Sequence, residues 1–232
     1  MKVRKLHDWH VSVRQAILLQ ERLSEMVVWE GQAPCVRLAA GCDAAYDTAQ
    51  GILYGGVVLW DLAQKRVVES QVSRGHVTFP YVPGLLAFRE TPVLLEALAR
   101  LKGEPDVMLV DGQGIAHPRS MGLASHLGLH TMVPTVGCAK TILVGSHGPI
   151  GSLRGDWTWL HYEGSRVGAV VRTRSRVRPI YVSPGHRISI EGALQVVVRC
   201  LGQFRLPEPV RQAHLLVAQH KREASHSSQD GL

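Results

Sequence analysis

The stretch that decides the fold is VRLAAGCDAAY at residues 36–46, followed by ILYGGVVLWD at residues 52–61 and RVVESQVSR at residues 66–74. The first is apolar and small, and the other two are rich in β-branched and aromatic residues, which favours strands. The connections at residues 47–51 and 63–65 are short enough for hairpins. The sequence therefore predicts an antiparallel meander of three strands.

Outward from this meander, helical periodicity alternates with short apolar runs. Thr91 can cap a helix and Pro92 suits its first turn, while Gly103 can end it. Strands separated by helices pair in parallel through right-handed crossovers. The predicted elements are, in order, a helix over residues 8–26, the meander, the helix that begins at Thr91, a strand over residues 106–110, a helix around residues 119–127 and a strand over residues 133–138.

This order predicts the fold class: an α/β, ribonuclease H-like mixed sheet, in which three antiparallel strands are followed by parallel strands, flanked by helices. The C-terminal elements expected are Gly- and Ser-rich loops over residues 145–165, edge strands over residues 167–173 and 179–182, a helix that Ser189 caps and a last helix that Pro209 opens. We expect a single domain over residues 1–220 and a polar, disordered tail over residues 221–232.

The charge balance indicates a polyanionic partner. Lys and Arg outnumber Asp and Glu by 26 to 19, which gives a net charge of +7. Neutralising nucleic-acid phosphates releases counterions, so a basic surface favours such binding. Several arginines gather in one stretch, namely Arg166, Arg172, Arg174, Arg176, Arg178 and Arg187. The alternative for them is an edge strand whose charges prevent aggregation.

Other bulk features narrow the classes of protein. No apolar run approaches the roughly 18 residues of a membrane helix, and the basic start has no apolar stretch behind it. We therefore expect a cytoplasmic protein with no signal peptide and no membrane partner; we also expect a monomer. The four cysteines show no CxxC spacing, which argues against a cysteine-based zinc site and a disulfide framework. Cys42 and Cys138 are expected in the core.

Three carboxylates stand at informative places. Asp43 lies within the apolar run AAGCDAAY, where a carboxylate is costly to bury unless it is paired or binds a metal. Asp111 ends a predicted buried strand, at the sheet edge where sites gather. Glu90 precedes the predicted helix start. The alternatives are a structural aspartate for Asp43, a turn or cap for Asp111 and a response to the helix dipole for Glu90.

Together these residues predict a metal-dependent hydrolase. Mg²⁺ takes oxygen ligands and keeps several waters, so two or three convergent carboxylates suffice. Such an ion can activate water and stabilise charge in phosphodiester hydrolysis. Lys140, after the predicted strand VPTVGC, can neutralise a phosphate; a solvated lysine is the alternative. We expect Asp43, Glu90 and Asp111 to meet around one cation.

Five segments resemble endonuclease V: PYVPGLLAFRE (residues 80–90), VDGQGIAHPR (110–119), GLASHLG (122–128), PTVGCAK (134–140) and GHRIS (185–189). The resemblance covers about residues 8–217. It implies a ribonuclease H-like fold and dependence on Mg²⁺ or Mn²⁺. It also implies recognition of hypoxanthine and hydrolysis of the second phosphodiester bond 3′ to the lesion, giving 5′-phosphate ends. Asp43 and Asp111 would be metal ligands, and Glu90 the third acidic catalytic residue.

The resemblance also implies roles for residues outside the carboxylate group. Tyr81, on the loop that contains Pro83, would fill the gap left by the displaced base; a core or turn tyrosine is the alternative. Lys140 and His214 match positions at the family's active site, although a histidine on an apolar helix face is often simply buried. The residues expected around the displaced base are Gly112, Gly114 and His117.

The chain departs from the family's pattern at four positions. Gln113 stands where a histidine is usual and Ala116 where a serine is usual, and Thr141 and Cys138 are also atypical. None of these changes touches the carboxylates, so they bear on lesion preference. The sequence leaves open DNA or RNA as substrate and one or two metal ions. Rival functions are a ribonuclease H acting on RNA–DNA hybrids and a non-catalytic inosine-binding protein.

Overall fold

The predicted meander forms one side of the sheet. In this computed structural model, which describes residues 1–227, it consists of β1 (Leu38–Asp47), β2 (Ile52–Asp61) and β3 (Arg66–His76). Both pairs are antiparallel, and Asp43 on β1 lies opposite Gly56 on β2. The prediction of three antiparallel strands is confirmed.

Two parallel strands follow on the other side of β1. They are β4 (Val107–Val110) and β5 (Thr135–Ala139). β1 pairs in parallel with β4, and β4 pairs in parallel with β5, which is the predicted ribonuclease H-like order. Because these strands run in the same direction, the residues that follow β4 and β5 lie at one edge of the sheet.

Four further strands extend the sheet beyond β5: β6 (Ser146–His147), β7 (Trp157–Tyr162), β8 (Ser165–Val171) and β9 (Ile180–His186). Within residues 1–227 the strand order is β3-β2-β1-β4-β5-β9-β8-β7-β6. Two predictions were wrong here. Residues 145–165 hold β6 and β7 besides loops, because flanking glycines and serines masked the strand pattern WTWLHY. β6 and β7 lie beyond β8 in the sheet. The segments predicted as edge strands, residues 167–173 and 179–182, therefore belong to β8 and β9 inside the sheet.

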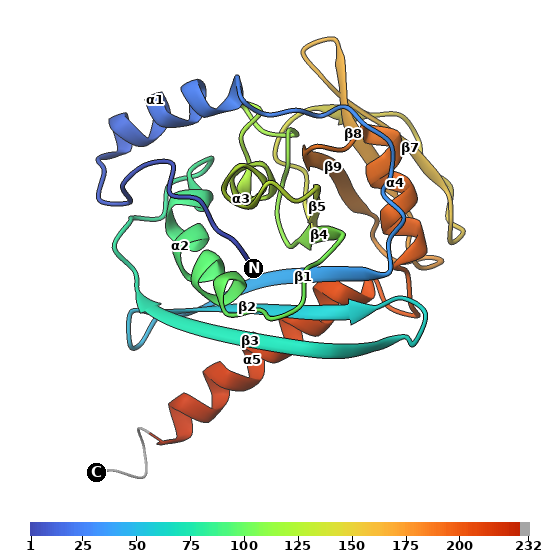
Figure 1. Ribbon diagram of the computed structural model, residues 1–232. Coiled ribbons are helices and arrows are strands. Elements are labelled where there is room, and N and C mark those ends of the chain that lie inside the picture. The colour runs from blue at the N-terminus through green and yellow to red at the C-terminus, as the bar shows by residue number, and fades with distance from the viewer. Residues whose placement is uncertain (228–232) are drawn as a thin grey trace.

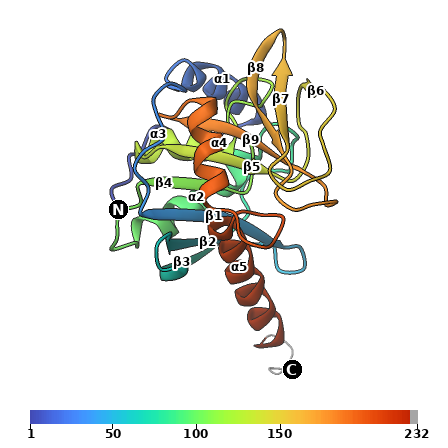
Figure 2. The ribbon, with the colours of Figure 1, turned by 90° about the vertical axis from the view of Figure 1, so that its right-hand side faces the viewer.

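The helices cover both faces of the sheet (Figures 1 and 2). They are α1 (Val13–Ser24), α2 (Leu86–Ala99), α3 (Leu123–Thr131), α4 (Ile190–Arg199) and α5 (Glu208–Ser227). Alternate residues of β1 join different cores: Ala40 packs with α2 and α3, and Ala39 packs with α4 and the start of α5. Cys42 and Cys138 are fully buried in these cores, as predicted.

The start of α2 differs from the prediction. The helix begins at Leu86, so Pro92 lies inside it and Thr91 is a buried helical residue. A proline inside a helix removes one hydrogen bond and costs about 3 kcal/mol, which burial of the apolar face of α2 offsets. Glu90 therefore lies beyond the first turn of the helix, where the helix dipole has little effect on it.

The two ends of the chain also correct predicted bounds. α1 is shorter than predicted because Ser12 caps it in a reciprocal pair with Gln15. α5 runs through Ser227, so the disordered tail predicted from Lys221 is wrong for residues 221–227. The rest of that tail, residues 228–232, lies outside the described residues.

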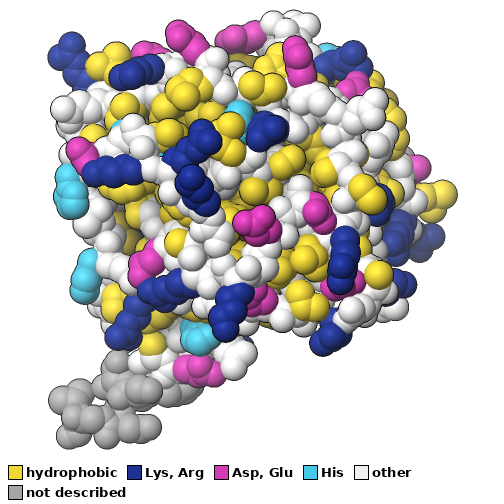
Figure 3. Space-filling view, in the orientation of Figure 1, with side chains coloured by type: hydrophobic (Ala, Val, Ile, Leu, Met, Phe, Trp, Pro, Cys, Tyr) yellow, Lys and Arg dark blue, Asp and Glu magenta, His cyan; other side chains and the backbone are white. Residues whose placement is uncertain are grey.

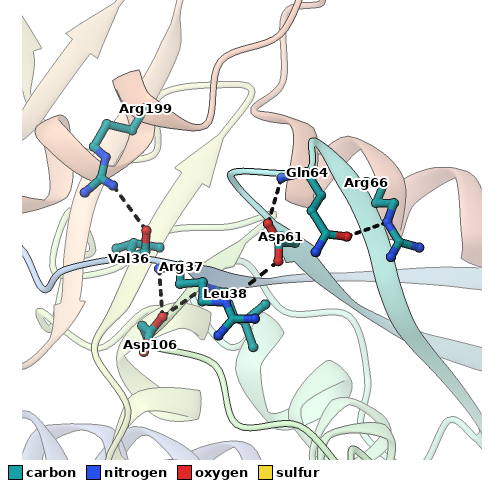
Figure 4. Close-up of polar contacts among 8 residues, drawn as sticks. All are labelled: Val36, Arg37, Leu38, Asp61, Gln64, Arg66, Asp106 and Arg199. Atoms are coloured by element: carbon teal, nitrogen blue, oxygen red, sulfur yellow. Dashed lines mark hydrogen bonds and ion pairs between the residues drawn. The ribbon is translucent and has the colours of Figure 1, made fainter.

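The register between β1 and β4 is fixed at their N-terminal ends (Figure 4). Asp106 Oδ2 accepts hydrogen bonds from the backbone amides of Arg37 and Leu38, both at 2.9 Å. In return, the Asp106 amide donates to the Leu38 carbonyl. These bonds hold the two strands in step, and this decides which residues stand side by side five positions further on.

Candidate active site

Two aspartates stand side by side at the centre of the sheet. Cys42 pairs with Val110 in the parallel register, and the Asp111 amide donates to the Cys42 carbonyl at 2.9 Å. Asp43 and Asp111 are therefore neighbours on adjacent strands, at the predicted edge. The Asp43 side chain is 9% exposed and that of Asp111 is 12% exposed, so both carboxylates are largely withdrawn from water.

α5 brings a histidine to the same place. A Cβ on Gly41 would lie 1.9 Å from the Pro209 carbonyl oxygen, and one on Gly56 would lie 2.3 Å from a Val217 methyl group. These two glycines therefore let α5 approach β1 and β2 closely. His214 Nδ1 lies 2.8 Å from Asp43 Oδ2. Its side chain is 48% exposed, so it is not the buried histidine of the alternative interpretation.

Lys140 and Glu90 complete the charged group. Lys140 follows β5, and its ammonium forms a salt bridge with Asp111 Oδ2. Glu90 approaches from α2 and is partly buried. Sheet topology thus brings Asp43, Asp111 and Lys140 to the same end of the strands, and α2 contributes Glu90 from one face of the sheet.

The electrostatics of the site favour a bound cation. Burial and then repulsion from Asp111 raise the pKa of Asp43 to about 6, against the opposing effects of His214 and Lys140. Burial, followed by repulsion from Asp43 and Asp111, raises the pKa of Glu90 to about 8. Crowded carboxylates of this kind hold protons that a divalent cation can replace.

The donor atoms of this centre are close enough to share one ion. One ligand atom each from Asp43, Asp111 and His214 lies within 4.8 Å of the other two. Glu90 is not a member of this group, although electrostatic repulsion from both aspartates contributes to its raised pKa. The two aspartates therefore meet as predicted, whereas Glu90 adjoins the centre. We call Asp43, Asp111 and His214 the acidic centre.

A cavity of about 340 Å³ opens beside the acidic centre. Asp111 and Lys140 line it on one side, and the loop that carries Tyr81 lines it on the other. Tyr81 is 71% exposed, which excludes a core tyrosine. The other predicted lesion-site residues that line the cavity are Pro83, Gly112 and His117.

The loop that carries Tyr81 is anchored at its far end. The Gly84 carbonyl oxygen accepts hydrogen bonds from Gln20 Nε2 at 3.0 Å, His117 Nε2 at 2.8 Å and Arg119 Nη2 at 3.0 Å. Burial lowers the pKa of His117 to about 4, so this ring is neutral and donates from Nε2. An exposed ring on a fixed loop is the geometry that a wedge needs. Gln20 was missed because α1 looked purely structural.

Other residues depart from their predicted places or were not predicted. Gly114 does not line the cavity: its amide donates to Ser183 Oγ, and a Cβ there would lie 2.0 Å from the Pro184 carbonyl oxygen. It is a packing residue. The exposed side chains of Ile142 and Leu143 line the cavity mouth. Exposed apolar residues directly after Lys140 were the available signal for them.

Basic residues are interspersed with acidic ones on one face of the molecule. Figure 3 shows Lys and Arg side chains mixed with Asp and Glu on the face seen in Figure 1. Of the predicted arginine group, Arg172 and Arg187 donate to backbone carbonyls, and Arg166 lies over the Trp159 ring at 4.9 Å. These three therefore have structural contacts besides any role with phosphates. None of the described helices is long and apolar enough to cross a membrane.

Comparisons with known proteins agree with this geometry. A curated endonuclease V from Roseiflexus castenholzii is 43% identical over 94% of this chain and 98% of its own length. A crystal structure of endonuclease V from Bacillus subtilis superposes with a TM-score of 0.92 at 33% identity, covering 98% of this chain and all of that one.

A more distant structure shares the fold. Endonuclease V from Ciona intestinalis, in complex with a 23mer DNA containing an inosine followed by a ribo-adenosine, has a TM-score of 0.80 at 24% identity, over 92% of this chain and all of that one. The sequence model named Endonuclease V matches residues 21–215. The match spans the meander, the acidic centre and the loop that carries Tyr81, and the chain belongs to the endonuclease V family.

Proposed function

We propose that this protein is a repair endonuclease that recognises hypoxanthine or inosine in a nucleic acid and hydrolyses the second phosphodiester bond 3′ to it. The observation that carries the proposal is the acidic centre beside a cavity that Asp111 lines and that an exposed, anchored tyrosine borders. Hydrolytic residues and a base-sized cavity thus share one wall, at Asp111 and Lys140.

The residues present fit Mg²⁺, for which Mn²⁺ can substitute. Asp43 and Asp111 supply the carboxylate oxygens that such hard ions prefer, and their repulsion is relieved by positive charge. We assign these two as the ligands. A divalent ion held there supplies acidity to a water molecule and neutralises charge on the scissile phosphate.

The neighbouring side chains have separate tasks. His214 holds Asp43 by the hydrogen bond to Oδ2 and so fixes the direction of its other oxygen. Lys140 places a positive charge beside Asp111, where it can neutralise a phosphate oxygen. Glu90, with a pKa raised to about 8, can hold or release a proton at its carboxyl group near neutral pH.

The cavity accounts for recognition of the damaged base. Tyr81, with Pro83 behind it, stacks in the gap left in the strand and offsets part of the unstacking cost of a few kcal/mol. The base enters the cavity lined by Gly112 and His117. Gln113 lies in the same wall, where its Nε2 donates to the Thr141 carbonyl at 3.0 Å.

The proposal includes a monomer that acts in the cytoplasm on DNA, with inosine-containing RNA as a second substrate. The Ciona intestinalis relative was crystallised with inosine-containing DNA, which favours DNA as the first substrate to test.

One assay tests the proposal and its rivals. Matched DNA and RNA strands with and without inosine, and an RNA–DNA hybrid without inosine, are incubated with the full chain with and without Mg²⁺. We expect Mg²⁺-dependent products that end in 5′-phosphate, cut at the second bond 3′ to inosine. Equal cleavage of the undamaged hybrid would establish the ribonuclease H alternative. Binding of inosine strands without any product would establish the non-catalytic one.

A further inference from the structure

Three histidines meet outside the acidic centre. His126 and His130 are one helical turn apart on α3, and His7 comes from the N-terminal segment. One ring nitrogen of each lies within 4.8 Å of the other two. We call these three residues the histidine cluster. The family match begins at residue 21, so His7 lies outside it.

The cluster lies among aromatic side chains. The Trp9 ring is 5.3 Å from both the His126 and His130 rings, and the Phe88 ring is 5.3 Å from His126. His126 and His130 are almost fully buried, and His7 is partly exposed. Burial lowers the pKa of all three rings. The rings are therefore neutral at neutral pH and each has one nitrogen lone pair.

Hydrogen bonds fix the tautomers of two rings. His7 Nδ1 lies 2.8 Å from the Asp8 carbonyl oxygen, and His130 Nδ1 lies 2.6 Å from the Arg4 carbonyl oxygen. A carbonyl can only accept, so both Nδ1 atoms carry the proton and both Nε2 atoms carry the lone pair. A histidine held by an Nδ1–H bond to a carbonyl presents the lone pair of Nε2, as metal-bound histidines do.

Two of the remaining ring nitrogens have no partner in the part of the chain that the structure describes. His7 Nε2 carries a lone pair, so it accepts a hydrogen bond from His126 Nε2–H at 2.7 Å. His126 Nδ1 and His130 Nε2 are buried, and neither has a hydrogen-bond partner within residues 1–227. Buried nitrogens without hydrogen-bond partners are unfavourable. In the described chain the His130 nitrogen without a partner is Nε2, which carries the lone pair because Nδ1 donates to the Arg4 carbonyl.

We propose that His7, His126 and His130 form a second metal site, selective for a divalent transition-metal ion of the zinc class. Imidazole nitrogen suits Zn²⁺ and Co²⁺, whereas Mg²⁺ prefers oxygen. Histidines four residues apart on a helix present two ligands on one face. The His126 proton moves from Nε2 to Nδ1 when all three Nε2 atoms bind the ion, and a water molecule fills the fourth position.

The ion would fasten the N-terminal segment to α3. That segment already forms two backbone bonds, from the Arg4 amide to the His130 carbonyl and from the Met1 amine to the Leu101 carbonyl. Zn–N bonds of about 2.0–2.1 Å set ligand nitrogens about 3.3 Å apart in a tetrahedral site. The partly exposed His7 ring therefore has to withdraw slightly from His126, which its place on a terminal segment allows.

The test separates this site from the acidic centre. The full chain carrying Asp111→Asn is stripped with a chelator and titrated with Zn²⁺ against a fluorescent competitor, and with Co²⁺ by visible absorption. We expect one ion per chain, a tetrahedral Co²⁺ spectrum and a rise in melting temperature with Zn²⁺. His7→Gln should weaken binding at least about 100-fold and remove both the spectrum and the thermal shift.

Matched variants keep the test decisive. His161→Gln removes an exposed histidine on β7 and should bind as the parent does. His130→Gln serves as a second cluster variant, and circular dichroism checks that it folds. If His130→Gln does not fold, the result for His7→Gln decides the test. Absence of binding in the Asp111→Asn parent, or equal binding by His7→Gln, would overturn the proposal and leave the three rings as a packed aromatic cluster.

Discussion

The acidic centre and the histidine cluster have similar distances between their donor atoms but differ in charge. In each, three donor atoms lie within 4.8 Å of one another. The acidic centre combines two crowded carboxylates with one histidine beside an open cavity, and burial together with repulsion from Asp111 raises the pKa of Asp43. The histidine cluster combines three neutral rings packed against Trp9 and Phe88.

The difference shows how the charge of the ligands and the exposure of the site to solvent decide which ion a site binds and whether that ion is catalytic or structural. Repelling carboxylates at a cavity are suited to a hard cation that keeps waters and meets a phosphate. Neutral imidazoles enclosed by aromatic rings are suited to a softer ion with a structural task. If this contrast holds, variants of the acidic centre change cleavage, and variants of the histidine cluster change stability.

The largest effect is expected for Asp111→Asn. Losing this carboxylate should reduce the cleavage rate on the order of 10³-fold or more, comparable to losing a principal electrostatic group of an active site, while binding of inosine-containing DNA remains. Single-turnover cleavage and fluorescence anisotropy measure the two. Asp106→Asn, at the opposite end of β4, should change stability without changing the rate of the folded protein. Wild-type cleavage by Asp111→Asn would remove the metal assignment.

Glu90→Gln is expected to reduce cleavage by about 10²-fold, the contribution typical of an acid–base group. The same change should stabilise the metal-free protein at high pH. The folded pKa of Glu90 is raised from 4.5 to about 8, so the folded state binds the extra proton and stability is lost as the pH rises through that window.

The pH dependence gives a direct measurement. In chelator, at about pH 9, chemical denaturation should show Glu90→Gln more stable than wild type by about 2 kcal/mol, since each pKa unit corresponds to about 1.4 kcal/mol and relaxation reduces the total. At about pH 4.5 the two should be alike. Glu96→Gln, half-exposed on the same helix, should show no such gain. A stability difference that does not depend on pH would contradict the raised pKa of Glu90.

Tyr81→Ala should reduce discrimination between inosine and undamaged DNA about tenfold, because stacking of one base on an aromatic ring contributes about 1–3 kcal/mol. Tyr81→Phe keeps the ring and should retain most of the selectivity. The ratio of cleavage rates on matched strands measures both. Unchanged selectivity in Tyr81→Ala would exclude the wedge role.

Sheet topology explains why the meeting of the two aspartates was predictable, whereas His214 was suggested only by the family resemblance. Short hairpins and apolar strand patterns defined β1 to β3, and two aspartates on adjacent strands must meet when their register is fixed. The start of α2 was not predictable from Thr91 and Pro92, because Leu85 at the real N-cap provides no side-chain hydrogen bond. Burial of the helix face, which depends on the whole fold, decided it.

The histidine cluster could not be predicted in this way. The spacing of His126 and His130 is visible in the sequence, but it is equally compatible with two packed rings. His7 joins them only because the N-terminal segment lies along α3, which the Arg4 amide and the His130 carbonyl bring about. No local pattern encodes a contact between residues 7 and 126, so only the tertiary structure shows it.

A smaller effect is expected for Gln113→His, which restores the residue usual in the family. Gln113 lines the cavity and its Oε1 is buried without a partner among the described residues. An imidazole at this position would remove the hydrogen bond from Gln113 Nε2 to the Thr141 carbonyl. Such a hydrogen bond contributes about 1 kcal/mol. We expect the preference between inosine-containing DNA and RNA to shift about fivefold, with cleavage retained. An unchanged preference would show that position 113 does not contact the base.

The smallest effect on cleavage is expected from His7→Gln, and it is the sharpest test of the contrast. His7 contacts His126 and aromatic rings, whereas the residues of the acidic centre come from β1, from the position directly after β4 and from α5. Cleavage of inosine-containing DNA at saturating Mg²⁺ should therefore stay within about twofold of wild type, well under the effect of one hydrogen bond at the reacting atoms. The melting temperature in Zn²⁺ should fall at the same time. If cleavage instead fell in parallel with zinc binding, the two centres would be coupled. Phe88, which packs against His126, and Glu90 of the active site both lie on α2. Displacement of the N-terminal segment would then move both residues.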